Sequence, residues 1–238
     1  MGSTFLVCHG AWSAGWAWKK VHPLMAARGH RLVTPSYTGL GERAHLANPS
    51  IDLETHIQDI LNVIKYEDLR DIVLVGHSFG SLIAGLVTDR IPERIAHLVI
   101  IDGGIPQDGQ SIFGRIPAEI VAKRQKLVQV VNGTEVLPFA PVGSLIIDDP
   151  ALAAWTHRQL TPHPLACYTK PIRLNHPAGN GRPMTYIACT KPRYPVSAGM
   201  HEKVQAMAHI RFRPIEAGHN CIISAPDLVA HELLEVPR

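Results

Sequence analysis

The stretch Asp71-Ile72-Val73-Leu74-Val75-Gly76-His77-Ser78-Phe79-Gly80 decides the fold of this 238-residue chain. Residues 72–75 are aliphatic with no polar alternation, a pattern typical of a strand buried on both faces of a parallel sheet. A helical pattern follows from Leu82 to Arg90. Between the two lies a Gly-x-Ser-x-Gly pentapeptide, and this context predicts a sharp turn that presents the Ser78 hydroxyl as a nucleophile. The alternative is a Gly/Ser turn with no chemical role.

Strands and helices alternate on both sides of this stretch. Short apolar runs predict strands at 4–8, 31–34, 71–75, 97–101, 184–189 and 210–214. Helical spacing of apolar residues predicts helices at 14–28, 51–67, 82–90, 198–208 and 227–235. Such alternation predicts an α/β fold with a mainly parallel, doubly wound sheet, which binds ligands at the carboxyl ends of its strands.

Residues 106–182 interrupt this alternation. They contain helix-like stretches at 118–131 and 151–159, separated by a segment that is rich in Pro and Gly. We therefore expect one core domain made of residues 1–105 and 183–238, with residues 106–182 inserted as a lid.

Composition and charge exclude several classes of protein. Hydrophobic residues make up 46% of the chain and charged residues 18%, so intrinsic disorder is excluded. The net charge of +3 comes from scattered basic residues, which argues against nucleic acid as a partner. No apolar run has the length of a membrane span or a signal peptide, so we expect a cytoplasmic protein without a membrane partner.

No cofactor and no metal site are expected. The cysteines lack the spacing of metal ligands and are expected to be free thiols, at Cys8, Cys167, Cys189 and Cys221. The stretch Gly39-Leu40-Gly41-Glu42-Arg43-Ala44 matches the dinucleotide-binding fingerprint. It opens no obvious helix and lies several residues past the preceding strand, so we interpret the match as accidental.

A serine nucleophile needs an adjacent base, and His219 is the predicted one. It directly follows the last strand and precedes the last helix, where the order serine, acid, histidine places the base. His9 and His77 also flank the expected site and remain alternatives. Both lie in turns, where packing or a backbone hydrogen bond is the commoner role of histidine.

The acid that orients the histidine is harder to identify. In folds of this kind it commonly follows the strand predicted at 184–189, but no carboxylate stands there before Glu202 in the next helix. Asp102 ends the strand directly after the Ser78 helix, at the carboxyl edge of the sheet. We therefore favour Asp102 over Asp108, the alternative being an aspartate that only caps a loop.

Backbone amides complete the predicted site. Two N–H groups must face the developing oxyanion, and the residue after the nucleophile, Phe79, supplies one of them. The loop His9-Gly10-Ala11-Trp12 supplies the other from Ala11. The residues expected to contact the substrate are Gly10, Trp12, Phe113, Phe139 and Trp155.

Several motifs occur together along nearly the whole chain: His9-Gly10-Ala11-Trp12, Gly15-Trp16, Thr38-Gly39-Leu40-Gly41-Glu42-Arg43, Gly76-His77-Ser78-Phe79-Gly80, Ile101-Asp102-Gly103 and Gly218-His219. In these motifs the chain resembles the α/β-hydrolase superfamily, and more narrowly the small esterases similar to plant methylesterases, hydroxynitrile lyases and their bacterial relatives. The resemblance implies a cofactor-free hydrolase with a lid over its site.

Differences within that family favour one chemistry. The lyases carry a polar residue at the place of Gly10 and, in one branch, a lysine where this chain has Asn220. The plant enzymes also keep an aspartate near the place of Pro192, whereas this chain resembles the bacterial branch that lacks it. The differences at Gly10 and Asn220 point to ester hydrolysis, whereas the difference at Pro192 means that the assignment of Asp102 depends on its position alone.

The sequence therefore predicts a serine carboxylic ester hydrolase that works through an acyl-enzyme on a small apolar or aromatic ester. Lyase or other cofactor-free chemistry on the same frame is one alternative, since the fold does not determine the reaction. A non-catalytic receptor for a small ligand is the other. The expected partner is the small-molecule ester, and a homodimer is left open.

Overall fold

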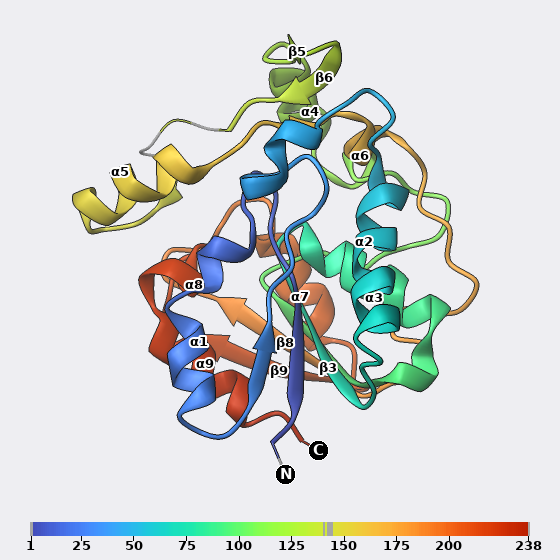
Figure 1. The fold of residues 1–238 in the computed structure, drawn as a ribbon, viewed down its shortest axis with the longest axis vertical. Helices are drawn as coiled ribbons and strands as arrows, with labels where there is room; N and C mark the ends of the chain where they lie inside the picture. The colour runs from blue at the N-terminus through green and yellow to red at the C-terminus, as the bar shows by residue number, and fades with distance from the viewer. Residues whose placement is uncertain (1, 140, 142–144, 238) are drawn as a thin grey trace.

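The computed structural model describes residues 2–139, 141 and 145–237. Within these residues its centre is a six-stranded sheet in the order β2-β1-β3-β4-β8-β9, with every neighbouring pair parallel (Figure 1). The strands are β1 Thr4–Cys8, β2 Arg31–Val33, β3 Ile72–His77, β4 Ile95–Ile101, β8 Met184–Cys189 and β9 Ile210–Ile215. The chain winds outward from β1 in both directions, so the prediction of a doubly wound α/β sheet is confirmed.

Helices cover both faces of this sheet (Figure 1). One face carries α1 Val21–Ala26, α8 Cys221–Ser224 and α9 Pro226–Leu234, and the other carries α2 Leu53–Tyr66, α3 Gly80–Arg90 and α7 Ala198–Gln205. Successive residues of β1 alternate between the two apolar cores. Leu6 and Cys8 pack in one, and Phe5 and Val7 pack in the other. Burial on both faces explains why the central strands have no polar alternation.

Helix α2 shows how local sequence determines an element. Asp52 caps it, because the carboxylate accepts a hydrogen bond from the backbone N–H of Thr55 while the Thr55 side chain accepts one from the Asp52 N–H. The buried face then recurs at helical spacing through Ile57, Ile60 and Ile64. This helix packs against α3, which follows Ser78.

Residues 106–182 hold a second, smaller group of elements above one end of the sheet, opposite the two termini (Figure 1). A three-stranded antiparallel sheet has the order β5-β6-β7 in the described residues. The elements are η4 Phe113–Arg115, α4 Ala118–Gln125, β5 Gln129–Val131, β6 Thr134–Leu137, α5 Pro150–Gln159, β7 His163–Pro164 and α6 Ala166–Thr169. The division of the chain into a core domain and a lid stays a prediction.

Two of the predicted helices are wrong in extent. The stretch 118–131 was predicted as one helix, but α4 ends at Gln125 and β5 follows. Asn132 and Gly133 both have positive φ, of 50° and 77°, and together they close the β5–β6 hairpin. The helix predicted at 14–28 is likewise divided into η1 Gly15–Trp18 and α1.

The structure also bears on the predictions for the cysteines and for the dinucleotide-like stretch. The four cysteines are free and buried, as expected. The stretch that resembles a dinucleotide fingerprint begins only a short 3-10 helix, η2 Gly41–Leu46. A further short helix, η3 Pro92–Arg94, precedes β4. Among the helices of the described residues, none combines the length and the apolar character that crossing a membrane requires.

Candidate active site

Ser78 occupies the turn between β3 and α3, with a backbone φ of 54°. Glycine at both flanking positions makes this turn possible. A Cβ at Gly76 would lie 2.5 Å from the Cα of Ser81, and one at Gly80 would lie 2.0 Å from the carbonyl oxygen of Cys8. Strand and helix therefore approach closely, and the hydroxyl of Ser78 projects from the turn into a cavity.

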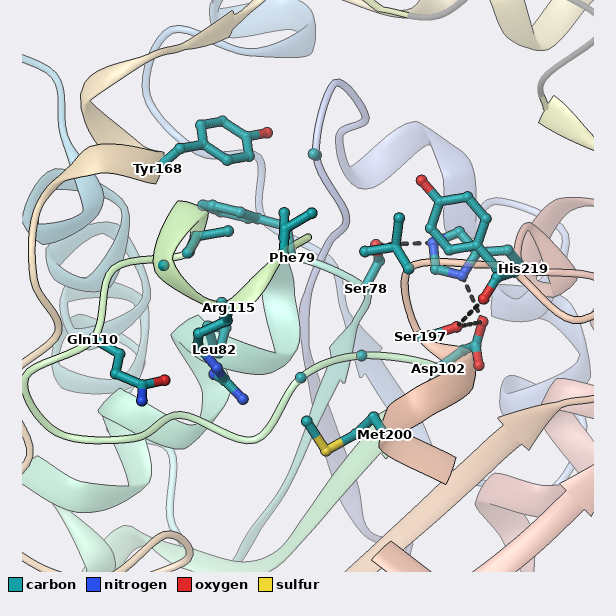
Figure 2. Close-up of a pocket in the computed structure, with 18 of the residues that line it drawn as sticks. Ser78, Phe79, Leu82, Asp102, Gln110, Arg115, Tyr168, Ser197, Met200 and His219 are labelled. Atoms are coloured by element: carbon teal, nitrogen blue, oxygen red, sulfur yellow. Dashed lines mark hydrogen bonds and ion pairs between the residues drawn. The ribbon is translucent and has the colours of Figure 1, made fainter. Parts of the chain in front are cut away.

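His219 lies in the loop between β9 and α8 and contacts Ser78 directly. Its Nε2 is 2.9 Å from Ser78 Oγ, and its Nδ1 is 2.6 Å from Asp102 Oδ2 (Figure 2). The ring of Tyr194 stacks on the imidazole, with centroids 4.1 Å apart and planes inclined by 25°. The structure thus joins the predicted nucleophile, base and acid in one chain of hydrogen bonds.

Asp102 directly follows β4, and its side chain is fully buried. Beside His219, three further groups donate to its carboxylate. Ser197 Oγ lies 3.0 Å from Oδ2, and His201 Nε2 lies 2.5 Å from Oδ1. The backbone N–H of Cys189 approaches Oδ1 at 3.4 Å. Both oxygens are therefore held in place, and Oδ2 points at His219.

These donors determine the charge of Asp102. Burial by itself raises the pKa of this carboxyl, but the hydrogen bonds from His201 and His219 outweigh it. The pKa of Asp102 is consequently well below its usual range. At neutral pH the group is an ionised carboxylate, which can hold the Nδ1–H tautomer of His219 and stabilise its protonated form.

His9 and His77, the two alternative bases, form hydrogen bonds with backbone groups. His9 Nε2 accepts a hydrogen bond from Tyr37 N at 3.1 Å, and its Nδ1 lies 2.9 Å from Gly10 O. His77 Nε2 donates to the carbonyl oxygen of His219 over 2.8 Å. Burial lowers the pKa of His9 to about 3 and that of His77 to about 4, so both rings are neutral at neutral pH. They fix the loops that carry the site.

The alternative acid lies elsewhere. Asp108 is exposed, and its Oδ1 accepts a hydrogen bond from the backbone N–H of Leu174 at 3.0 Å. It thereby caps a loop within residues 106–182 and forms no contact with His219 in the described structure.

Ala11 and Phe79 both line the cavity at Ser78. Phe79 precedes the first turn of α3, so its N–H has no partner within the helix. Among the described residues, neither amide donates a hydrogen bond to another part of the chain. Both N–H groups are therefore available to a ligand oxygen beside Ser78.

Two cavities meet at Ser78. The first, which we call the Arg115 cavity, has a volume of about 390 Å³ and extends past Phe79, Leu82 and Arg115 (Figure 2). The second, which we call the Phe139 cavity, has a volume of about 450 Å³. Its walls are mainly apolar and include Leu137, Pro138, Phe139, Leu160, Ile222 and Ile223. Ser78, His219 and Tyr194 line both cavities.

Of the residues predicted to contact the substrate, three line a cavity at Ser78 and two do not. Trp12 lines both cavities, and Gly10 and Phe139 line the Phe139 cavity. Two placements need correction, because neither Phe113 nor Trp155 lines a cavity at Ser78. Phe113 is buried in the core, 5.4 Å from the ring of Tyr168. Trp155 packs edge-on against Trp16 and lies under Lys19 Nζ.

Several residues of the site carry no sequence signal. Ser197 and His201 reach Asp102 from the start of α7, and Tyr194 precedes that helix. Arg115 and Tyr168 reach the cavity from the 106–182 segment. No motif marks these positions, because their contacts depend on how distant segments pack. In the part of the chain that the structure describes, no group of three or more His, Cys, Asp or Glu side chains is arranged to hold a metal ion.

Comparison with known proteins places the chain among hydrolases. A family model described as "Alpha/beta hydrolase family" matches residues 5–232. A carbendazim hydrolyzing esterase of Nocardioides sp. (strain SG-4G) is 34% identical over 187 residues, which is 75% of this chain and 75% of that protein. Methylesterase 2 of Arabidopsis thaliana is 32% identical over 118 residues, or 45% of this chain and 41% of that protein.

A solved structure is similar over almost its full length. It is an extracellular α/β-hydrolase from a Paenibacillus species, described as sharing structural and functional homology with tobacco salicylic acid binding protein 2. It superposes with a TM-score of 0.84 at 25% identity and covers 99% of each chain.

Proposed function

The chain belongs to the alpha/beta hydrolase family, and from that premise we propose that it is a serine carboxylesterase. The observation that carries the proposal is the continuous chain of hydrogen bonds from Ser78 Oγ through His219 to Asp102. The relatives named as esterases support the same chemistry. Ser78 is the nucleophile, His219 the general base and Asp102 the acid that orients it.

The reaction proceeds in two halves. His219 Nε2 takes the proton of Ser78 Oγ as that oxygen attacks the ester carbonyl carbon, and Asp102 stabilises the imidazolium. His219 then gives the proton to the leaving alcohol, which departs and leaves an acyl group on Ser78. In the second half His219 activates a water molecule, which attacks the acyl-enzyme and releases the acid.

The N–H groups of Ala11 and Phe79 bind the negative oxygen of the tetrahedral intermediate. Their freedom from other partners supports this role. Each such donor typically contributes about 3–4 kcal/mol to the stability of the transition state. Ala11 lies in a turn and Phe79 at the start of α3, so both donors belong to ordered backbone.

The substrate is a small ester with an apolar or aromatic part. The Phe139 cavity, with Leu137, Leu160 and Ile222 in its walls, supports this assignment, because its volume suits a small apolar group. The relatives are named for carbendazim and for methyl esters, which are also small.

Release of nitrophenol from para-nitrophenyl acetate and butanoate tests the function. The wild type is expected to hydrolyse both, and Ser78→Ala is expected to reduce turnover by roughly 10⁶-fold. A fluorophosphonate should also label the wild type at Ser78, identified by peptide mass. Tight ligand binding without turnover or labelling would instead support a non-catalytic receptor, and cleavage of a carbon–carbon bond would support a lyase.

A further inference from the structure

Two residues that line the Arg115 cavity carry polar atoms that no protein group satisfies. Nη1 of Arg115 is buried and has no hydrogen-bond partner, and neither does the phenol oxygen of Tyr168, whose side chain is buried. Figure 2 shows the Arg115 side chain beside Leu82, on the other side of Ser78 from His219. An unpaired buried donor is unfavourable, and a site that holds two of them is suited to a ligand that accepts hydrogen bonds.

The charges of this cavity are unbalanced. Arg115, Arg124 and Lys203 line it, although Arg124 also lines the Phe139 cavity, and its single carboxylate in the described residues is Asp102. Both oxygens of Asp102 already accept hydrogen bonds, from His201 and His219. No ion pair of the described residues involves Arg115 or Lys203. The cavity therefore presents positive charge without an internal counter-charge.

Burial makes the positive charge of Arg115 unfavourable unless an anion compensates it. Desolvation lowers the pKa of this guanidinium, but an arginine remains protonated at neutral pH. A partly buried cation of this kind is best compensated by an anion that can accept two parallel N–H bonds. Carboxylates have that geometry, and the fork of a guanidinium matches it.

The position of the cavity indicates which part of an ester enters it. Of the two amides proposed to bind the carbonyl oxygen, Ala11 lines both cavities, whereas Phe79 lines only the Arg115 cavity. The leaving oxygen must lie beside His219, which lines both cavities and whose chain neighbours Asn220 and Ile222 line only the Phe139 cavity. The acyl part therefore extends toward Arg115, and the alcohol part extends into the apolar cavity.

We propose that the Arg115 cavity binds a carboxylate carried by the acyl part of the substrate, so that the enzyme prefers half-esters of dicarboxylic acids. This inference rests on the proposed esterase function and deepens it. Arg115 is the residue that selects the charged acyl group, while Arg124 and Lys203 add to the positive field of the cavity.

Matched esters test the charge preference. The mono-para-nitrophenyl esters of adipic and suberic acid are compared with para-nitrophenyl hexanoate and octanoate, which have the same chain lengths without the charge. The methyl-capped diesters serve as neutral polar controls. The wild type is expected to show a kcat/KM about 10- to 100-fold higher for the half-esters, the range of a hydrogen bond to a charged group. Equal or reversed preference would overturn the proposal.

Variants assign the preference to Arg115. Arg115→Gln should lower kcat/KM for the half-esters far more than for hexanoate, so that the ratio of the two falls to about one, whereas Arg115→Lys should retain part of the preference. Arg28→Gln, an exposed cation far from the site in sequence and on the opposite face from α7, is the matched control and should change neither rate. If Arg115→Gln reduces hydrolysis of both esters equally, Arg115 has only a structural role.

The design separates this inference from the esterase proposal. Hydrolysis of hexanoate that depends on Ser78, without a charge preference, would refute the carboxylate site alone. If no ester is hydrolysed, calorimetry on Ser78→Ala still decides, since monomethyl adipate should bind more tightly than methyl hexanoate and Arg115→Gln should remove the difference. A preference seen only for carboxyphenyl hexanoate over phenyl hexanoate would place the charge on the alcohol and overturn the acyl assignment.

Discussion

His201 donates a hydrogen bond from Nε2 to Asp102 Oδ1 over 2.5 Å, on the carboxylate oxygen that His219 does not use. Both His201 and Asp102 are buried, with 2% and 1% of their surfaces exposed. One buried carboxylate thus accepts hydrogen bonds from two imidazoles, of which His201 is the more deeply buried. This relationship makes His201 a positioning residue, because it acts on the reaction only through Asp102.

Replacing His201 by Leu should therefore impair catalysis. The loss leaves Oδ1 with only the longer hydrogen bond from the Cys189 N–H, so the carboxylate is held less firmly toward His219 and kcat/KM should fall roughly 10- to 100-fold. His201→Gln keeps an N–H donor and should lose less than about fivefold. The pKa of Asp102 should rise in the Leu variant, which adds a second titration to the acidic limb of the pH–rate profile.

The exposed His209, from the loop after α7, provides the control, since His209→Gln should match the wild type in rate and profile. A purely structural role of His201 would lower the melting temperature of both substitutions and leave the pH profile unmoved. That result would contradict the positioning role.

The identity of the acid gives a second prediction. Asp102→Asn keeps the size of the side chain but removes the charge that stabilises the imidazolium, so kcat should fall by roughly 10⁴-fold. Asp108→Asn alters only the cap on Leu174 N and should stay within about threefold of the wild type. Steady-state rates with para-nitrophenyl butanoate measure both. If the two variants lose activity alike, or if only the Asp108 variant does, Asp102 is not the acid.

Much of this fold could be predicted because the deciding signals are local. The strand at 184–189 matches β8 residue for residue, since a mainly apolar run that begins after Pro183 and ends before Thr190-Lys191-Pro192 has few other interpretations. Ser78 could be identified from its pentapeptide, and His219 from its place after the last strand. Asp102 followed from topology, because β4 ends next to the Ser78 turn at the same edge of the sheet.

The remainder depends on packing between distant segments. His201 meets Asp102 only because α7 returns across the sheet, ninety-nine positions along the chain. Phe113 and Trp155 were predicted as contacts because they are apolar residues of the inserted segment, and apolar side chains serve equally well to fill a core. Helical spacing up to residue 131 concealed the Asn132-Gly133 turn, whose backbone conformation favours a hairpin.

The tight turn at Ser78 gives a third prediction, on stability. A Cβ at Gly80 would lie 2.0 Å from Cys8 O, and its neighbours there are backbone atoms that cannot move aside easily. Gly80→Ala should therefore cost at least about 3 kcal/mol, which lowers Tm by roughly 6–12 °C in a domain of this size. Differential scanning calorimetry measures the change.

Gly199→Ala is the matched control for this substitution. Gly199 lies in α7, and a Cβ there would meet no atom within 4 Å. Alanine in a helix is favoured over glycine by roughly 0.5–1 kcal/mol, so Tm should stay unchanged or rise slightly. A small effect of Gly80→Ala, comparable to that of Gly199→Ala, would show that the turn can relax and that the glycine is not required.

The buried histidines give the last prediction, on the pH dependence of unfolding. Burial lowers the pKa of His9 to about 3 and those of His56 and His77 to about 4, whereas in the unfolded chain they titrate near about 6.5. The unfolded state binds more protons below that value, so stability is fully present above it and is lost as the pH falls toward 4. Each group contributes a slope of about 1.4 kcal/mol per pH unit within this window.

Asp102 acts only at lower pH, because its lowered pKa affects stability below the unfolded value of about 3.9. Urea denaturation between about pH 7.5 and about pH 4.5 should show this loss of stability. His56→Asn should lower the slope of the unfolding free energy against pH by the share of one histidine, about 1.4 kcal/mol per pH unit, even if it lowers stability overall. A free energy of unfolding that stays constant across this range would mean that the histidines are protonated, or exposed, in the folded protein.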